Sequence, residues 1–133
     1  MAAFLIDTCV LIDHLTGRLA QPVSEWLEQA ACSGALATSV VVYHELLTGT
    51  KSQKAQVAIK TLLGTWALFP VDRAVAEKAA ALRRERAARG KPGGMADSLI
   101  AATAELHSFK VVTANLKDFP GALAPEEAVT TQI

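Results

Sequence analysis

Four acidic residues far apart in the chain have a side-chain type and a placement that could support chemistry: Asp7, Glu45, Asp97 and Asp118. Each stands where an apolar segment ends or a short helix begins. Open α/β sheets bind ligands in the crevice at the carboxyl ends of their strands, so we expect these side chains to converge there. Converging carboxylates repel one another unless a cation joins them. The pattern therefore predicts a site for Mg²⁺, which prefers oxygen ligands, and chemistry on phosphates.

Metal-assisted hydrolysis of a phosphodiester is the reaction that such a set of carboxylates would support. In its two-metal form, ions about 3.5–4 Å apart activate a water and stabilise the leaving oxygen. Asp7 and Asp97 are the leading metal ligands, and Glu45 completes the first site or positions the water. Asp118 is expected to hold a second metal or to act through a water. The three histidines have no ligand spacing among them, so zinc is not the expected metal.

Polar and basic residues beside these acids are candidates for binding substrate or for orienting the carboxylates. Thr113 and Asn115 follow a predicted strand, where they could hydrogen-bond a carboxylate or a phosphate oxygen. Arg86 and Arg89 belong to a basic cluster just before a glycine-rich turn. The cluster is either the exposed face of a long helix or a patch that contacts phosphates without recognising bases.

The elements that must position these residues alternate between strand and helix. The predicted strands cover residues 3–7, 35–38, 68–71 and 110–113. The predicted helices cover residues 8–15, 25–31, 39–49, 51–63, 72–89 and 98–104. Their expected N-caps are Thr8, Ser24, Thr38 or Ser39, and Asp72. Because hairpin signals are almost absent, the alternation predicts an α/β domain with a parallel sheet.

Length and composition predict one folded domain over residues 1–133. Hydrophobic residues make up 51% of the chain and charged residues 20%, which excludes disorder. The formal net charge is zero, so no global field attracts nucleic acid or a membrane, and any RNA contact must be local. No stretch approaches the roughly 20 apolar residues that span a bilayer. Cys9 and Cys32 fall in apolar segments, where we expect them to be buried and reduced, as in a cytoplasmic protein.

The segment from Leu5 to Asp13 resembles the opening of PIN-domain proteins, specifically the VapC-type toxins of bacterial toxin–antitoxin pairs. Three further segments fit the same family: residues 39–49 with Glu45, residues 90–103 with Asp97, and residues 112–119 with Asn115 and Asp118. The resemblance spans nearly the whole chain with the motifs in order. It implies a PIN-like three-layer fold, in which helices flank a short central parallel sheet.

The resemblance also implies an activity, a cofactor and partners. It implies an endoribonuclease that depends on Mg²⁺ or Mn²⁺, forms a homodimer and is neutralised by a cognate VapB-type antitoxin that obstructs the site. The acids that match the family's motifs are the same four. Two positions depart from the family's pattern. Cys9 stands where relatives often have Asn, and Asn115 stands where many relatives have the last acid, which leaves Asp118 as its counterpart here.

Three other functions remain open at this stage. A phosphoacceptor receiver domain has a similar length and class, but it needs paired acids at its first strand, where this chain has a lone Asp7. A catalytically inactive domain that only binds a partner is disfavoured, since clustered carboxylates cost stability without a use. A nuclease acting on DNA or on structured flaps is the third, because metal-assisted hydrolysis does not itself select the sugar.

Overall fold

The computed structural model describes residues 2–131 of the 133-residue chain. The elements are β1 (Phe4–Ile6), α1 (Thr8–Leu15), α2 (Gln21–Cys32), β2 (Leu36–Ser39), α3 (Val40–Thr48), α4 (Gln53–Leu63), β3 (Ala67–Phe69), α5 (Arg73–Ala88), α6 (Met95–Leu106), β4 (Lys110–Val112), the 3₁₀ turn η1 (Leu116–Asp118) and α7 (Pro125–Val129). The predicted alternation of strands and helices is confirmed, with strand ends that differ by one or two residues.

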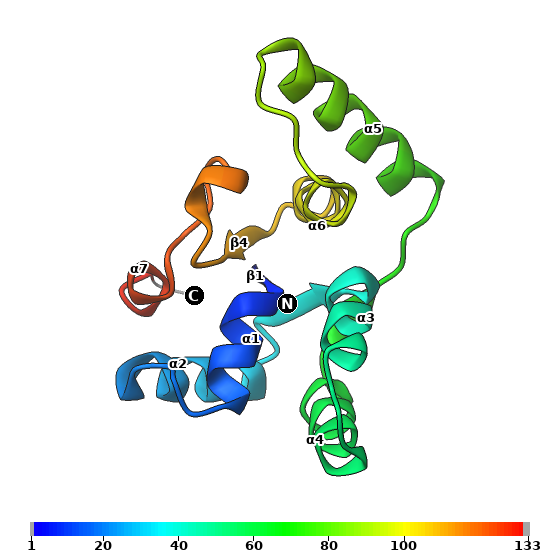
Figure 1. Cartoon of the computed structure of the whole chain (residues 1–133). Coiled ribbons are helices and arrows are strands. Elements are labelled where there is room, and N and C mark those ends of the chain that lie inside the picture. The colour runs from blue at the N-terminus through cyan, green and yellow to red at the C-terminus, as the bar shows by residue number, and fades with distance from the viewer. Residues whose placement is uncertain (1, 132–133) are drawn as a thin grey trace.

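The strands form a parallel sheet in the order β3-β2-β1-β4. β1 is central: Phe4 pairs with Leu36 of β2 on one side and with Lys110 of β4 on the other. Figure 1 shows α5 and α6 on one side of the sheet and α1 and α2 on the other. This arrangement is the expected three-layer architecture. Because the strands are parallel, the carboxyl ends of β1, β2 and β4 lie along the same side of the sheet, called here its carboxyl edge.

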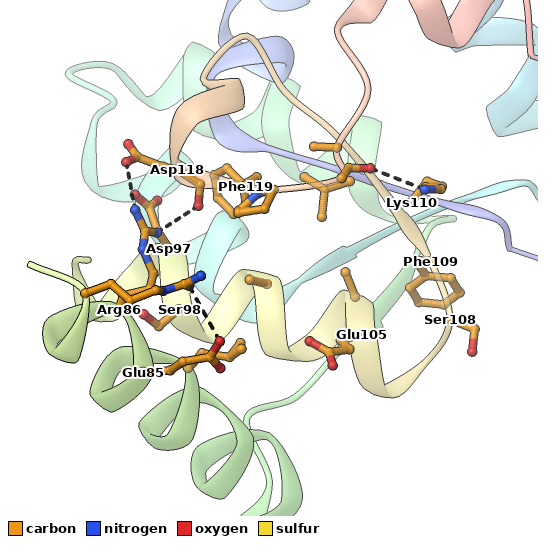
Figure 2. A pocket seen from close by; sticks show the side chains of 18 residues that line it. Glu85, Arg86, Asp97, Ser98, Glu105, Ser108, Phe109, Lys110, Asp118 and Phe119 are labelled. Atoms are coloured by element: carbon orange, nitrogen blue, oxygen red, sulfur yellow. Dashed lines mark hydrogen bonds and ion pairs between the residues drawn. The ribbon is translucent and has the colours of Figure 1, made fainter. Parts of the chain in front are cut away.

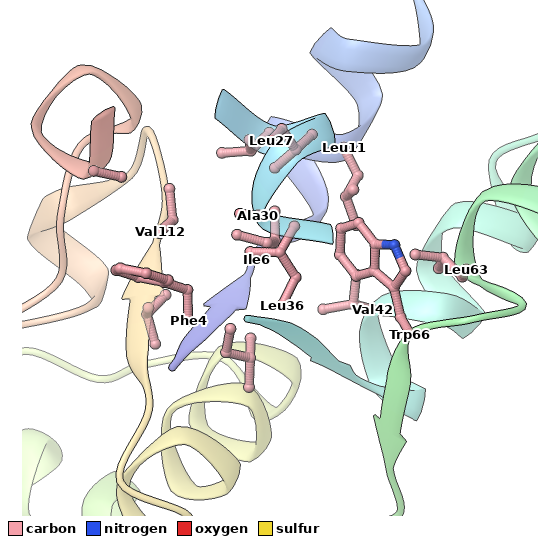
Figure 3. Packing of buried hydrophobic residues seen from close by; sticks show 14 of the residues in the cluster. Phe4, Ile6, Leu11, Leu27, Ala30, Leu36, Val42, Leu63, Trp66 and Val112 are labelled. Atoms are coloured by element: carbon pink, nitrogen blue, oxygen red, sulfur yellow. The ribbon is translucent and has the colours of Figure 1, made fainter. Parts of the chain in front are cut away.

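The core is built on β1, whose three residues are all buried. Figure 3 shows apolar side chains around this strand, among them Leu27 from α2 and Trp66 from the segment before β3. Leu5 and Ile6 are fully enclosed because helices cover both faces of a parallel sheet. The apolar run that precedes Asp7 therefore fixes the position of that acid from within the core.

Side-chain caps begin three of the helices, among them α1, which Asp7 caps, and α3, which carries Glu45. Ser39 caps α3, and Gly49 ends it, as the sequence predicts. Asp72 caps α5, again as predicted. The predicted cap of α1 is wrong, because Asp7 rather than Thr8 accepts the first free backbone N–H. Asp is a somewhat better N-cap than Thr, which agrees with the observed cap at Asp7.

Three further expectations are corrected. α2 begins at Gln21 rather than at residue 25, because Pro22 fits the first turn of a helix, where its missing N–H costs nothing. α6 begins at Met95, so Asp97 lies inside its first turn. Cys32 is exposed rather than buried, since it ends α2 at the surface, whereas Cys9 is half-buried. Within residues 2–131, no helix has the length and apolar character needed to cross a membrane.

Candidate active site

Asp7 is the most buried of the four acids, with 7% of its surface exposed. Its Oδ1 accepts a hydrogen bond from the backbone N–H of Thr8 at 2.8 Å. Its Oδ2 accepts one from the Thr113 hydroxyl, also at 2.8 Å, and a longer one from the Cys9 thiol at 3.6 Å. Burial raises the pKa of the Cys9 thiol, and the charge of Asp7 adds to this, so the thiol stays protonated and donates. Asp7 is therefore held in one orientation at the end of β1.

Glu45 reaches the same edge of the sheet from the middle of α3. Its Oε1 accepts a hydrogen bond of 2.6 Å from the hydroxyl of Thr8, the residue that follows Asp7. The hydroxyl of Thr38 also ties β2 to the end of β1, donating to the Ile6 carbonyl at 2.9 Å. These bonds fix the position of α3 relative to the Asp7 carboxylate. This role of Thr8 was not predictable from the sequence, because a hydrogen bond across 37 positions depends on the fold.

Asp97 projects from the first turn of α6, where the free N–H groups of a helix favour an acidic side chain. Ser98 steadies this turn, since its hydroxyl donates to the Gly94 carbonyl at 2.9 Å. Among residues 2–131, no side chain or backbone group donates a hydrogen bond to the Asp97 carboxylate. This half-buried carboxylate therefore keeps its oxygens available for a ligand.

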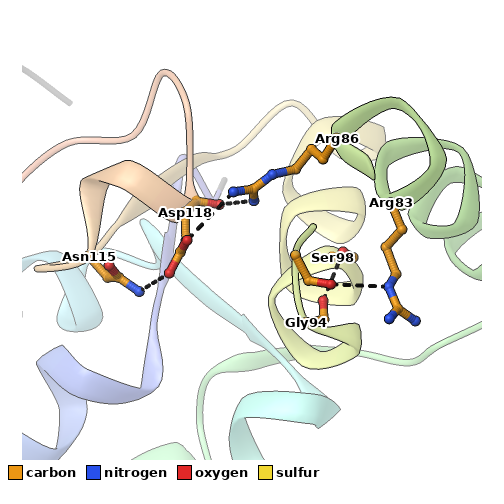
Figure 4. A network of polar contacts seen from close by, with 7 residues as sticks. Arg83, Arg86, Gly94, Ser98, Asn115 and Asp118 are labelled. Atoms are coloured by element: carbon orange, nitrogen blue, oxygen red, sulfur yellow. Dashed lines mark hydrogen bonds and ion pairs between the residues drawn. The ribbon is translucent and has the colours of Figure 1, made fainter. Parts of the chain in front are cut away.

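Asp118 completes the acidic set from the end of η1. Asn115 donates an amide hydrogen bond to its Oδ2, and the Arg86 guanidinium forms an ion pair of 3.5 Å with its Oδ1. Figure 4 shows Arg86 extending from its helix toward this carboxylate, with Asn115 on the other side. Asn115 thus contacts Asp118 directly.

The charges of the other three acids act on the carboxyl group of Asp97. Burial raises the pKa of Asp97, and the charges of Asp7, Asp118 and Glu45 raise it further in that order. Arg86 opposes these effects and lowers it. Acids separated by many tens of residues therefore act on a single carboxyl group, and their joint role as a metal site stays a prediction.

A cavity of about 710 Å³ adjoins the acidic site. Asp97 and Asp118 line one end of the cavity, and Phe109 and Lys110 line it farther along (Figure 2). Arg89 also lines it, but its side chain is 63% exposed and pairs with Glu85 at 3.6 Å. Arg86 is 17% exposed and pairs with Asp118, so the two arginines of the basic cluster have different surroundings. A role for either in substrate binding stays a prediction.

The chemistry of the donor set fits a hard divalent cation. Four carboxylates supply only oxygen ligands, which suit Mg²⁺ or Mn²⁺ better than softer metals. A cation bound to Asp97 would occupy its carboxylate oxygens and would lower the pKa that burial and the other acids raise. Between Ala2 and Thr131, no three His, Cys, Asp or Glu side chains are arranged to hold a metal ion, and Glu45 and Asp118 have hydrogen-bond partners within the chain.

Comparison with known proteins identifies the fold that carries this site. The family model described as "PIN domain" matches residues 4–120, which is most of the chain. The chain belongs to the PIN-domain family. Among curated proteins, this PIN domain is 34% identical over 116 residues to Ribonuclease VapC10 of Mycobacterium tuberculosis, covering 87% of this chain and 85% of that protein.

Solved structures resemble this PIN domain over nearly its full length. A toxin–antitoxin complex from Klebsiella pneumoniae matches with a TM-score of 0.73 and 28% identity, covering 92% of this chain and 98% of that one. FitAcB from Neisseria gonorrhoeae matches with a TM-score of 0.78 and 26% identity, with the same two coverages. Because the chain belongs to the PIN-domain family, the alternative of a phosphoacceptor receiver domain is excluded. The role of each acid in this PIN domain still rests on the geometry described above.

Proposed function

We propose that the chain is the toxin of a type II toxin–antitoxin pair, an endoribonuclease that uses Mg²⁺ or Mn²⁺ to hydrolyse phosphodiester bonds in RNA. The observation that supports the proposal is that the charges of three acids from separate elements of a PIN domain all act on the Asp97 carboxyl group. The curated relative named a ribonuclease supports RNA as the substrate. Relatives solved within toxin–antitoxin complexes support the role as a toxin.

Each acid has a distinct part in the proposed site. Asp7 and Asp97 would be the principal ligands of the ion, with Glu45 beside them and Asp118 completing the negative charge. When bound, the ion supplies a water that is acidic enough to act as a nucleophile near neutral pH, and it stabilises charge on the leaving oxygen. Thr113 and Thr8 hold two of these carboxylates in place, so little reorganisation is needed when the ion and the substrate bind.

The partners and the cellular place follow from the same proposal. We infer that the chain pairs with a cognate VapB-type antitoxin that covers the site, and that it forms a homodimer in the cytoplasm. Expression of the chain alone in a bacterial host should then arrest growth, whereas the Asp97→Asn variant should not. Light scattering on the purified chain should give the mass of a dimer. A monomer would contradict the dimer but not the nuclease activity.

The decisive test is cleavage of a mixed pool of structured RNAs with Mg²⁺ or Mn²⁺. We expect Asp7→Asn and Asp97→Asn each to reduce cleavage more than about 100-fold, because ligand loss exceeds the usual effect of outer-shell changes. EDTA should abolish the cleavage by wild type. Asp13→Asn is the matched control, since it makes the same change on α1 outside the acidic set.

Two results would contradict the proposal. Cleavage that survives EDTA and both variants would mean a contaminating nuclease or a metal-free mechanism. A folded wild type that neither cleaves RNA nor binds a divalent ion would favour a domain that only binds a partner. The same assay with single-stranded and duplex DNA decides whether the sugar matters.

A further inference from the structure

Arg86 brings a positive charge into an otherwise acidic site. It lies on α5, whose other arginines face solvent, yet only 17% of its side chain is exposed. Arg89, one turn farther along the same helix, is 63% exposed. An arginine that is desolvated to this extent requires specific partners, because a buried charge is costly unless it is paired.

Within residues 2–131, the guanidinium of Arg86 has its hydrogen bond and its ion pair with a single residue. Its Nη1 donates to the backbone carbonyl of Asp118 at 3.1 Å, and its Nη2 lies 3.5 Å from Oδ1 of the same residue. The guanidinium therefore contacts both the backbone carbonyl and the side-chain carboxylate of Asp118 (Figure 4). A planar guanidinium presents its donors in a rigid fork that suits two such contacts at once, whereas a lysine is a point charge on a flexible stem.

The turn between α5 and α6 leaves room for this group. A Cβ added to Gly93 would lie 3.2 Å from Nη1 of Arg86 and 3.4 Å from its Cζ. Arg83 secures the turn from the other side, since its Nε donates to the Gly93 carbonyl at 3.3 Å. Because Gly93 has no side chain, the guanidinium of Arg86 can lie close to the backbone of the turn.

Within residues 2–131, Asp118 is the one acid of the four that pairs with a cation. The Asn115 amide donates to its Oδ2 and the Arg86 guanidinium pairs with its Oδ1, whereas Asp7 and Glu45 are held by uncharged donors. A divalent ion there would also have to approach a fixed guanidinium, which repels it. Asp97 lines the same cavity, and within the described part of the chain it accepts no hydrogen bond from a protein group.

We propose that Arg86 supplies the second positive charge of this site, so that the chain binds a single divalent ion. That ion binds through Asp97 and Asp7, with Glu45 beside them, and Asp118 serves as the counterion of Arg86. The inference rests on the proposed function, which needs a bound metal but does not require a second ion. It makes Arg86 a positioning residue that replaces one metal ion of a two-metal site.

Titration of the full chain with Mn²⁺, followed by electron paramagnetic resonance and calorimetry, tests the inference without measuring activity. We expect wild type to bind one ion per chain. Asp97→Asn should weaken that binding at least about tenfold, the usual consequence of disturbing a metal site. Asp118→Asn should change it less than about threefold, because a partly solvated charge beside the ligands has a modest effect.

Substitution of the arginine gives the second half of the test. Arg86→Gln should free the Asp118 carboxylate and raise the stoichiometry from one ion to two. Adding Asp118→Asn to that variant should restore one ion. Arg89→Gln removes the same charge from the same helix without touching Asp118, so it should leave one ion bound with unchanged affinity.

Three results would overturn the inference. Wild type that binds two ions, the second being lost in Asp118→Asn, would make Asp118 a ligand. Arg86→Gln that folds but still binds one ion would show that Arg86 does not exclude a second. A folded wild type that binds no Mn²⁺ would end both this inference and the metal-dependent function. Circular dichroism checks folding, and if Arg86→Gln is unfolded, Asp118→Asn in the wild-type background decides the question.

Discussion

At the scale of single residues, the buried carboxylate of Asp7 depends on the donors around it. Thr113→Val removes the 2.8 Å hydrogen bond to Oδ2 with almost no change in shape. We expect the free energy of unfolding to fall by about 1–3 kcal/mol, since a buried acceptor loses a donor. Affinity for Mn²⁺ should fall about tenfold as the carboxylate becomes free to rotate. Urea denaturation and calorimetry measure the two effects.

The control for this change is Thr103→Val. Thr103 is equally buried, but its hydroxyl donates to the Leu99 carbonyl within α6. This variant should lose less than about 1 kcal/mol, because that carbonyl remains in the helical ladder. Its affinity for Mn²⁺ should equal that of wild type. Equal losses of metal affinity in both variants would show that Thr113 contributes only to folding.

Asp97 should make the metal-free protein less stable at neutral pH. Its pKa is raised above the ordinary value by burial and by the charges of Asp7, Asp118 and Glu45. The folded state therefore binds the proton more tightly than the unfolded state does. Stability falls as pH rises through the interval between the unfolded and folded pKa, and the full penalty applies above it.

Asp97→Asn removes that penalty, so in EDTA it should melt at a higher temperature than wild type at pH 7. The gain should shrink at a pH near the ordinary pKa of Asp, where the wild-type carboxyl is itself neutral. Mg²⁺ should stabilise wild type but not the variant. Thermal melting at several pH values measures all three, with Asp13→Asn as the neutral control. A variant less stable than wild type at pH 7 would contradict the electrostatic argument.

At the scale of elements, two serine caps separate helix stability from function. Ser39 caps α3, which carries Glu45, and accepts the Val41 N–H at 3.0 Å. Ser52 caps α4, which carries none of the four acids, and accepts the Ala55 N–H at 3.1 Å. Ser39→Ala and Ser52→Ala should each cost about 1 kcal/mol of unfolding free energy. Only Ser39→Ala should raise the Mn²⁺ concentration needed for half-maximal cleavage, and an equal rise in Ser52→Ala would argue for a global effect.

The elements were predictable to the extent that local patterns determine them. Apolar runs ending in polar residues located all four strands, and the caps at Ser39 and Asp72 follow from side-chain chemistry. The four acids followed from their places beside those elements. The contact of Arg86 with Asp118 did not, because it joins residues 32 positions apart and depends on how α5 packs against α6. For the same reason the basic cluster gave no sign that one of its arginines points inward.

At the scale of the whole molecule, stability is concentrated around the central strand. Leu5 is fully buried in the middle of β1, whereas Val57 on α4 is 55% exposed. Leu5→Ala should cost about 2–5 kcal/mol, because it leaves a cavity that the packed layers cannot fill. Val57→Ala should stay within about 0.5 kcal/mol of wild type. Chemical denaturation measures both, and a small loss for Leu5→Ala would mean that the sheet tolerates a void at its centre.

The strand order also determines when the acidic site can form during synthesis of the chain. β1 leaves the ribosome first, but its neighbour β4 belongs to the last quarter of the chain, and Asp7 meets Thr113 across 106 positions. A nascent chain that ends before Lys110 has half of the central pairing and lacks both Thr113 and Asp118. The polypeptide therefore cannot assemble its complete acidic site while most of it is still being translated. A nascent chain would therefore gain the proposed nuclease site only when the segment from Lys110 to Asp118 has joined the sheet beside β1.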